Sequence, residues 1–233
     1  LISPVSLMEE HPLSEENRQL VAGSRNSIER ILDGKDMRRV VIVGPCSIHD
    51  PAAAVEYASR LKVETMAFNN LLIVMRVYFE KPRTIVGWKG LINDPDIDGS
   101  FNINKGLKLA RELLLEIASI GLPSGTEFLD TTIGQFYADL VSWGAIGART
   151  AESQVHRELA SGLSMPVGIK NRTDGDLKVA VEGIKAANHK HLFPSLTREG
   201  TPAIYETEGN KYCHLILRGG DRSGSNYDAG SIA

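Results

Sequence analysis

The sequence is short of cysteine, of excess charge and of long apolar runs, and each shortage argues against a class of protein. Its two cysteines, Cys46 and Cys213, lie far apart in the sequence and cannot form a disulfide framework, which favours a reducing cytosol. No run of about 18 apolar residues is present, so we expect no membrane-spanning segment. The start has neither the basic region nor the apolar core of a signal peptide. A net charge of −3 gives no support for binding to nucleic acid or to a membrane surface.

Two catalytic motifs are also missing. No G-x-G-x-x-G pattern follows an apolar strand, so nothing supports a dinucleotide-binding sheet. No G-x-S-x-G pattern is present either. Ser153, His156 and Glu158 share one expected helix, whose spacing does not assemble a catalytic triad.

What is present is a repeated alternation of short apolar runs with amphipathic segments. We expect strands over residues 40–43, 71–75, 127–130, 145–149, 166–170 and 214–220. We expect helices over residues 14–33, 51–62, 105–120, 133–141, 152–163 and 177–187, and a hairpin over residues 191–207. Ser14 and Asp50 are suited to cap the first two helices, and Asp174 the last. The alternation is typical of an α/β fold with parallel strands.

Two architectures fit this alternation: a (β/α)8 TIM barrel and an open doubly wound sheet. A barrel takes about 250 residues, whereas only six β/α units follow residue 39 here. A separate sheet of six parallel strands would leave two unprotected edges. We therefore expect an incomplete (β/α)8 barrel over residues 39–233, with a β-hairpin insertion before its sixth strand. An N-terminal helical arm over residues 1–38 precedes it.

Charged residues follow the strands of this expected barrel. The second strand is followed by Arg76, Lys81 and Arg83, and the next four by Glu127 with Asp130, Arg149, Lys170 and Arg218. Strand ends are often polar because they meet solvent, but that explains a repeated positive charge poorly. Barrel enzymes bind their ligands at the C-terminal ends of the strands. We expect a small anionic ligand whose carboxylate and phosphate groups are held by Arg forks and Lys ammonium groups.

Cys46 permits two interpretations. A cysteine after a buried strand is most often a small packed apolar residue, but it can also be a metal ligand or a nucleophile. His49 nearby would suit a metal site and is equally typical of a loop. The pair Cys213 and His214 is a poor metal site, because adjacent residues of a strand point to opposite faces.

Several long motifs resemble one enzyme family. They are residues 44–50 (GPCSIHD), 75–84 (MRVYFEKPRT), 87–95 (GWKGLINDP), 144–150 (GAIGART), 152–163 and 216–220 (ILRGG). Over nearly all of its length the chain resembles the type I 3-deoxy-D-arabino-heptulosonate-7-phosphate (DAHP) synthases. Residues 225–229 look closest to fungal members of this family.

The resemblance implies a cytoplasmic, metal-dependent (β/α)8 barrel enzyme of the shikimate pathway, which condenses phosphoenolpyruvate with erythrose 4-phosphate and releases phosphate. It implies that Arg76, Lys81, Arg149 and Lys170 are catalytic, with Lys81 delivering a proton to the aldehyde oxygen. The substrate-binding residues that it implies are Arg76, Lys81, Pro82, Arg83, Thr84, Glu127, Ala148, Arg149, Lys170 and Arg218. Cys46 would be one ligand of a divalent ion such as Mn, Fe or Co, whose His, Glu and Asp ligands are absent from this chain.

The resemblance also implies a homo-oligomer, a dimer or tetramer, that an aromatic amino acid inhibits. The positions implied for this inhibitor are Gln135, Leu163, Ser164, Phe193, Ser195 and Tyr205. The plain alternative is that these residues pack the hairpin against a helix. Gly134, where phenylalanine-sensitive relatives often carry Pro, favours tyrosine or tryptophan as the effector.

The chain departs from the family at Arg172, where the family usually has Gly. An Arg there is expected to strain the turn if the position requires a positive φ. Two alternatives stay open at this point. One is a truncated, non-catalytic paralogue that binds only phosphoenolpyruvate or an aromatic effector. The other is a different phosphate-binding barrel enzyme, such as an aldolase that uses Lys170 to form a Schiff base.

Overall fold

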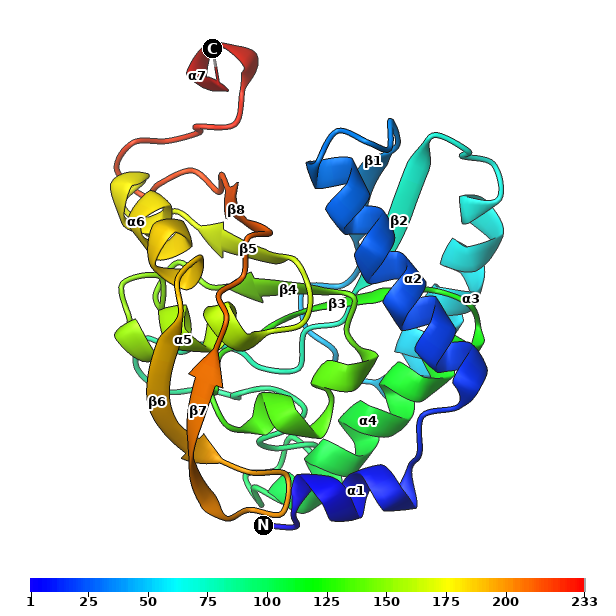
Figure 1. Ribbon diagram of the computed structural model, residues 1–233. Coiled ribbons are helices and arrows are strands. Elements are labelled where there is room, and N and C mark those ends of the chain that lie inside the picture. The colour runs from blue at the N-terminus through cyan, green and yellow to red at the C-terminus, as the bar shows by residue number, and fades with distance from the viewer. Residues whose placement is uncertain (233) are drawn as a thin grey trace.

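A curled sheet of six parallel strands is the centre of the computed structural model, which describes residues 1–232 (Figure 1). The strands lie in the order β1-β2-β3-β4-β5-β8. Their bounds are β1 Arg39–Val43, β2 Leu71–Arg76, β3 Ser124–Glu127, β4 Trp143–Ile146, β5 Val167–Lys170 and β8 Cys213–Ile216. Each strand pairs in parallel with the next in this order, which confirms the expected α/β barrel wall.

Helices connect successive strands and cover the outer face of the sheet. They are α3 (Pro51–Thr65), α4 (Ile103–Ser119), α5 (Gln154–Gly162) and α6 (Lys178–Ala187). Helix α3 packs against α4, and α5 packs against α6. As expected, Asp50 caps α3, because its carboxylate accepts the N–H of Ala53 at 3.1 Å and Pro51 occupies the first turn.

The two faces of the sheet bury different apolar clusters. Met75, Ile146 and Ile169 belong to the large cluster that the sheet shares with the helices. Val74 and Ala145, one residue away on β2 and β4, belong to a smaller cluster on the opposite face. This division follows from the alternation of side chains along a strand. Strands β3 and β4 are buried throughout, because they lie in the middle of the sheet.

An N-terminal arm made of α1 (Pro4–Glu10) and α2 (Glu15–Leu32) packs against the helical layer. The sequence did not predict α1. The expected cap of α2 is present, since the Ser14 hydroxyl accepts the N–H of Asn17 at 3.2 Å. Asn17 is itself buried and donates to the carbonyl of Leu115 on α4 at 3.3 Å.

Arg111 of α4 joins the arm to the segment that follows β3. Its side chain is only 1% exposed. It donates to the carbonyl of His11 at 2.9 Å and to that of Phe136 at 2.9 Å, and it makes a two-pronged pair with Asp139. A buried guanidinium with all these partners fixes three segments that are distant in sequence.

A two-stranded antiparallel hairpin lies between α6 and β8, as the sequence predicted. It consists of β6 (His191–Leu196) and β7 (Pro202–Thr207) and packs against α5 (Figure 1). Phe193 and Tyr205 are register partners whose rings stack at 6.2 Å. The chain then passes through β8 to a single helical turn, α7 (Ala229–Ile232).

The structure corrects several element boundaries. Strand β3 covers residues 124–127 rather than 127–130, β4 covers 143–146 rather than 145–149, and β8 covers 213–216 rather than 214–220. The segment 133–141 forms two 3-10 helices, Ile133–Phe136 and Ala138–Leu140, rather than one α-helix. Helix α6 has Leu177, not Asp174, at its N-cap, and no side chain caps it.

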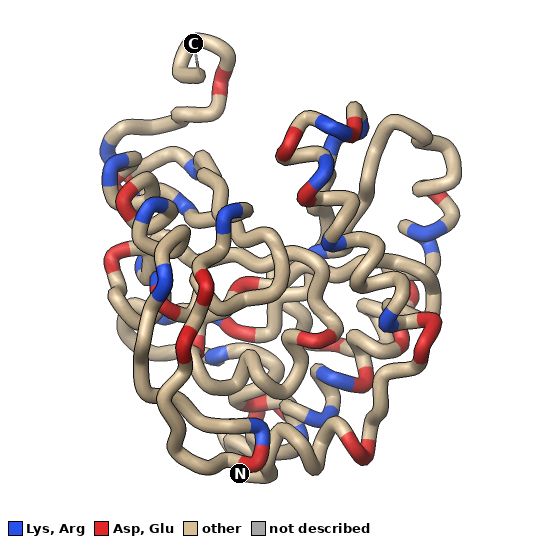
Figure 2. Tube along the Cα trace, viewed as in Figure 1, with Lys and Arg blue, Asp and Glu red and all other residues tan. Residues whose placement is uncertain are grey.

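The sheet is open at both sides within residues 1–232, with β1 and β8 as its edge strands. In Figure 1 these two strands face each other across the open side of the curl. Basic and acidic residues are spread along the whole trace (Figure 2). None of the helices in the described part of the chain is long and apolar enough to cross a membrane.

Candidate active site

The ends of the strands surround a cavity of about 480 Å³. Ten of the residues singled out from the sequence line it: Cys46, Arg76, Lys81, Pro82, Arg83, Glu127, Ala148, Arg149, Lys170 and Arg218. Thr84 and Asp130 do not line the cavity, and Thr84 is exposed. Residues that sequence reasoning missed complete the wall, namely Ser47, Tyr78, Glu80, Leu129, Gly147, Thr150 and Thr173.

Arg76, the last residue of β2, is anchored by the turn after β1. Its Nε donates to the carbonyl of Pro45 at 2.8 Å, and its Nη2 donates to that of Gly44 at 3.0 Å. The guanidinium lies 5.4 Å from the centre of the Tyr78 ring. Backbone carbonyls hold the side chain in place without neutralising its charge, so the charge remains available to an anion.

Lys170, the last residue of β5, forms an ion pair with the Glu127 carboxylate at the end of β3. Its ammonium nitrogen is also 5.4 Å from the Tyr78 ring centre. Glu127 is only 7% exposed. Gly147 leaves room for this pair, because a Cβ at that position would come within 2.7 Å of a Glu127 carboxylate oxygen. Both side chains of the pair are thus largely shielded from bulk solvent, and both line the cavity.

A loop after β2 carries Lys81, Pro82 and Arg83, and its shape is set by local contacts. The N–H of Lys81 donates to the carbonyl of Lys89 at 2.8 Å, and Arg83 Nε donates to that of Trp88 at 2.7 Å. Gly90 has φ 114°, and a Cβ there would collide with the backbone of the preceding segment. Only glycine allows this close approach, so the sequence fixes the path of the loop.

Two further cations complete the positive wall. Arg149 Nη1 donates to the carbonyl of Pro82 at 3.3 Å, which joins the β4 end to the loop after β2. Arg218 Nη1 donates to the carbonyl of Thr173 at 3.3 Å, and the N–H of Arg218 donates to the Asn171 side chain at 2.9 Å. Asn171 is fully buried, so it holds the β8 end firmly beside the β5 end.

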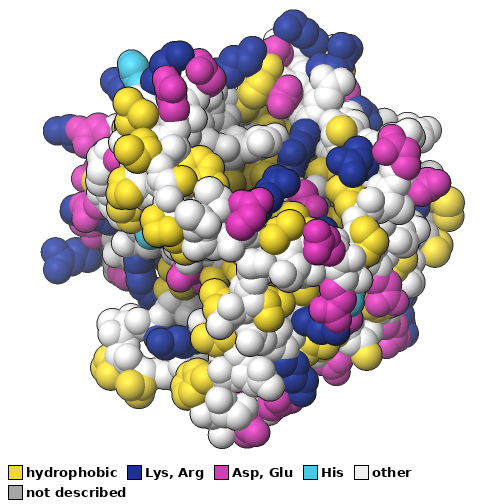
Figure 3. Space-filling view, turned by 60° about the horizontal axis from the view of Figure 1, so that its bottom comes forward, with side chains coloured by type: hydrophobic (Ala, Val, Ile, Leu, Met, Phe, Trp, Pro, Cys, Tyr) yellow, Lys and Arg dark blue, Asp and Glu magenta, His cyan; other side chains and the backbone are white. Residues whose placement is uncertain are grey.

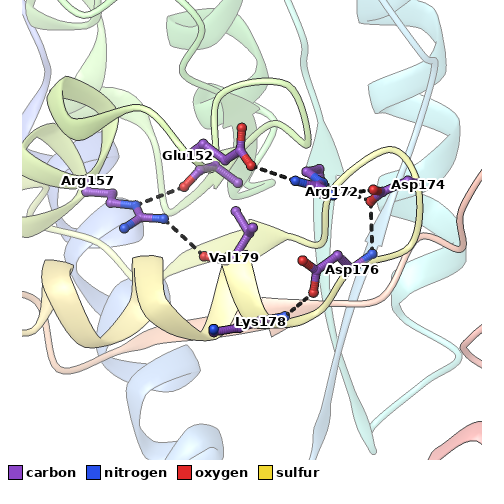
Figure 4. A network of polar contacts seen from close by, with 8 residues as sticks. Glu152, Arg157, Arg172, Asp174, Asp176, Lys178 and Val179 are labelled. Carbon is purple, nitrogen blue, oxygen red and sulfur yellow. Dashed lines mark hydrogen bonds and ion pairs between the residues drawn. The ribbon is translucent and has the colours of Figure 1, made fainter.

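Arg172 is not strained, contrary to the expectation from the family pattern. The non-glycine residues with positive φ in residues 1–232 are Ile97 and Phe101. Figure 4 shows Arg172 between Glu152 and Asp174, and it forms ion pairs with both. The substitution therefore links the loops that follow β4 and β5 at the edge of the cavity.

Glu80 lies in the cavity wall and is only 7% exposed. Its carboxylate accepts the N–H groups of Leu129 at 3.3 Å and Asp130 at 3.2 Å. Burial raises the pKa of Glu80 to about 7, and the nearby Asp130 carboxylate acts in the same direction, while the two N–H bonds oppose the shift. This carboxyl group therefore changes its charge near neutral pH.

Cys46 does not form a metal site with the other described residues. Its thiol is exposed and accepts a hydrogen bond from Lys81 Nζ at 3.5 Å. Among residues 1–232, no three His, Cys, Asp or Glu side chains are placed to hold a metal ion together. One thiolate is too few ligands for a bound divalent ion. The expected ligand role of Cys46 stays a prediction that needs residues beyond these.

A second cavity of about 780 Å³ lies between the arm, α5 and the hairpin. All six positions expected for an effector line it: Gln135, Leu163, Ser164, Phe193, Ser195 and Tyr205. Gln135 Nε2 and the Tyr205 hydroxyl both donate to the carbonyl of Leu196, at 2.5 and 3.0 Å. The other Gln135 amide atom, Oε1, is buried and has no partner in the described residues. It is an unused acceptor in the wall of this cavity.

Comparison with known proteins identifies the family. The model of the DAHP synthetase I family matches residues 11–233. The chain belongs to this family. A Trp-sensitive phospho-2-dehydro-3-deoxyheptonate aldolase of Enterobacter agglomerans is 56% identical over 100% of the chain and 67% of its own length. A Phe-sensitive one of Escherichia coli is 58% identical over 100% of the chain and 66% of its length.

A solved structure of a DAHP synthetase I relative supports the same assignment. The phospho-2-dehydro-3-deoxyheptonate aldolase of Francisella tularensis is 55% identical, with a TM-score of 0.96 over 100% of the chain and 68% of that protein. The chain thus spans about two thirds of the length of these DAHP synthetase relatives. They are bacterial, and the expected likeness to fungal members is not confirmed.

Proposed function

We propose that this chain carries the substrate-binding half of a DAHP synthase, which joins phosphoenolpyruvate to erythrose 4-phosphate and releases phosphate. The observation that carries the proposal is the cavity itself, into which four strand ends and one loop bring six cationic side chains. Both substrates are anions with a phosphate group, and one also has a carboxylate. Over the face in Figure 3, by contrast, basic and acidic side chains are interspersed.

The cations divide into two groups by position. Arg76, Arg149, Lys170 and Arg218 lie at the strand ends and would hold the carboxylate and phosphate of phosphoenolpyruvate. Arg83 lies on the loop after β2 and would hold the phosphate of the sugar. Lys81 lies on the same loop, next to Cys46, and is the residue we assign to the aldehyde.

The chemistry follows from this placement. Carbon 3 of phosphoenolpyruvate attacks the aldehyde carbon of erythrose 4-phosphate, and Lys81 donates a proton to the aldehyde oxygen, which becomes a hydroxyl. Water adds at carbon 2, and the bond between carbon 2 and the phosphate oxygen breaks. The strand-end cations stabilise the negative charge of the leaving phosphate. Residues 1–232 do not by themselves form a site for the divalent ion expected from the resemblance, of which Cys46 would be one ligand.

A regulatory function is supported by the second cavity. We propose that it binds an aromatic amino acid, whose ring would lie near Phe193 and Tyr205 and whose ammonium group would donate to Gln135 Oε1. The Trp-sensitive and Phe-sensitive names of the relatives support an effector of this class. The homo-oligomer expected from the sequence stays a prediction.

Two experiments test the proposed reaction. The first measures phosphate release by the full-length gene product with both substrates and added Mn²⁺; no release above the control without aldehyde would count against a synthase. The second is calorimetric titration of the 233-residue chain with phosphoenolpyruvate. Arg149→Gln should weaken binding about tenfold or more, because it removes a charge-assisted contact. Arg60→Gln, on the exposed side of α3, should leave binding unchanged.

A further inference from the structure

The Tyr78 ring lies beside two cations that come from distant strands. The Arg76 guanidinium carbon and the Lys170 ammonium nitrogen are each 5.4 Å from the ring centre. A cation within about 6 Å of an aromatic face is attracted by the partial negative charge of that face. Arg76 ends β2 and Lys170 ends β5, and two strands separate these in the sheet. The Tyr78 side chain thus contacts the ends of two strands that are not adjacent in the sheet.

The two cations have separate polar anchors. Arg76 is held by the carbonyls of the turn after β1, and Lys170 is held by Glu127. Neither anchor connects the two cations to each other. The face of the aromatic ring offsets the repulsion between them, because it attracts both cations at once. A third carboxylate in the same place would compete with an anionic ligand, whereas a ring without net charge does not.

The Tyr78 hydroxyl also stays neutral. Burial raises the pKa of the phenol above its ordinary value, and the negative charge of Glu127 acts in the same direction. The phenol therefore contributes a ring and a neutral hydroxyl, but no negative charge, near neutral pH.

We propose that Tyr78 is a positioning residue, which holds the Arg76 and Lys170 side chains together so that both contact the same anionic ligand. The inference rests on the proposed function, since it takes phosphoenolpyruvate as that ligand. A residue that only fills the cavity wall needs the right size. A residue that positions two cations needs the electron density of an aromatic face, and this difference can be measured.

The test is calorimetric titration of phosphoenolpyruvate into the 233-residue chain and three variants at Tyr78. Tyr78→Phe keeps the ring and should weaken binding by no more than about twofold. Tyr78→Leu removes both cation–π contacts and should weaken binding about fivefold to thirtyfold. Replacement of Tyr78 by 3,5-difluorophenylalanine keeps the shape of phenylalanine but withdraws electron density from the ring, so its affinity should fall between those of the other two.

A matched control is Tyr212→Leu, because Lys211 lies 4.6 Å from the Tyr212 ring but neither residue lines the cavity. This variant should bind phosphoenolpyruvate like the unchanged chain. If the unchanged chain binds no phosphoenolpyruvate, the proposed function is overturned together with the inference. If it binds and the phenylalanine and difluorophenylalanine variants bind equally well, the inference alone is overturned. The fluorinated variant decides the question even where Tyr78→Leu fails to fold.

Discussion

Glu80 should make the stability of this protein depend on pH in a direction that is unusual for a carboxylate. The folded state holds its proton up to a pKa of about 7, whereas the unfolded chain releases it at the ordinary value of 4.5. The stability linked to Glu80 is therefore fully present below pH 4.5 and is lost as the pH rises to 7. Since one unit of pKa corresponds to about 1.4 kcal/mol, the whole loss is about 3 kcal/mol.

Glu80→Gln should abolish this dependence. Glutamine has no proton to release, and its carbonyl oxygen can still accept the N–H groups of Leu129 and Asp130. At pH 5 the variant and the unchanged chain should differ by less than about 1 kcal/mol in their free energy of unfolding. At pH 8 the variant should be more stable by about 2 to 3 kcal/mol, because it avoids burying a charged carboxylate.

The assay is urea unfolding of the 233-residue chain, followed by circular dichroism between pH 5 and pH 8. The difference between the two proteins removes the contribution of every other titrating group. Glu56→Gln, at an exposed pair with Arg60 on α3, is the control and should show no change of this difference with pH. If the difference for Glu80→Gln is the same at pH 5 and pH 8, the carboxyl group titrates normally and the reasoning fails.

Three further outcomes can be measured on the same chain. Arg111→Leu should lower the free energy of unfolding by about 3 kcal/mol, because it removes a buried charge that makes four hydrogen bonds. Arg60→Leu on the surface should lower it by less than about 1 kcal/mol, and thermal unfolding measures both. Gly90→Ala should weaken phosphoenolpyruvate binding at least about tenfold, because the added Cβ displaces the loop after β2. Gly23→Ala is the control, since nothing lies within 4 Å of a Cβ there, and it should leave binding unchanged. Equal affinities of the two variants would refute the expected clash at Gly90. Mn²⁺ should show no stoichiometric binding at micromolar concentration, with or without Cys46→Ser, and a single tight site in calorimetry would contradict this.

The fold and the positive cavity could be predicted because they depend on repeated local signals. A short apolar run followed by a cation recurs at β2, β4, β5 and β8, and parallel strands necessarily bring their ends to one edge. The predicted position of β3 was wrong because Ser124, Gly125 and Thr126 are not apolar, although all three are buried in the centre of the sheet. Burial there comes from neighbouring strands, which a single sequence segment does not reveal.

Tyr78 and Glu80, which the sequence analysis did not single out, have a weaker signal in the sequence. Arg76, Tyr78 and Glu80 are two residues apart, so in extended chain their side chains point the same way. That spacing could have placed Tyr78 and Glu80 in the cavity with Arg76. The raised pKa of Glu80 could not be predicted, because it comes mainly from burial in the folded chain. The N–H groups that oppose the shift lie on a loop that begins 49 residues away.

The way in which the cations are held explains how a chain of net charge −3 maintains a positive cavity. Six cationic side chains line it against two carboxylates, so partial neutralisation by ion pairs cannot be the main source of their order. Backbone carbonyl groups hold four of them: Arg76, Arg83, Arg149 and Arg218. A carbonyl carries only a partial charge, so it orients a guanidinium and leaves the full positive charge for a ligand. The repulsion that remains between the cations is relieved when an anion binds, which favours a doubly charged ligand over a singly charged one.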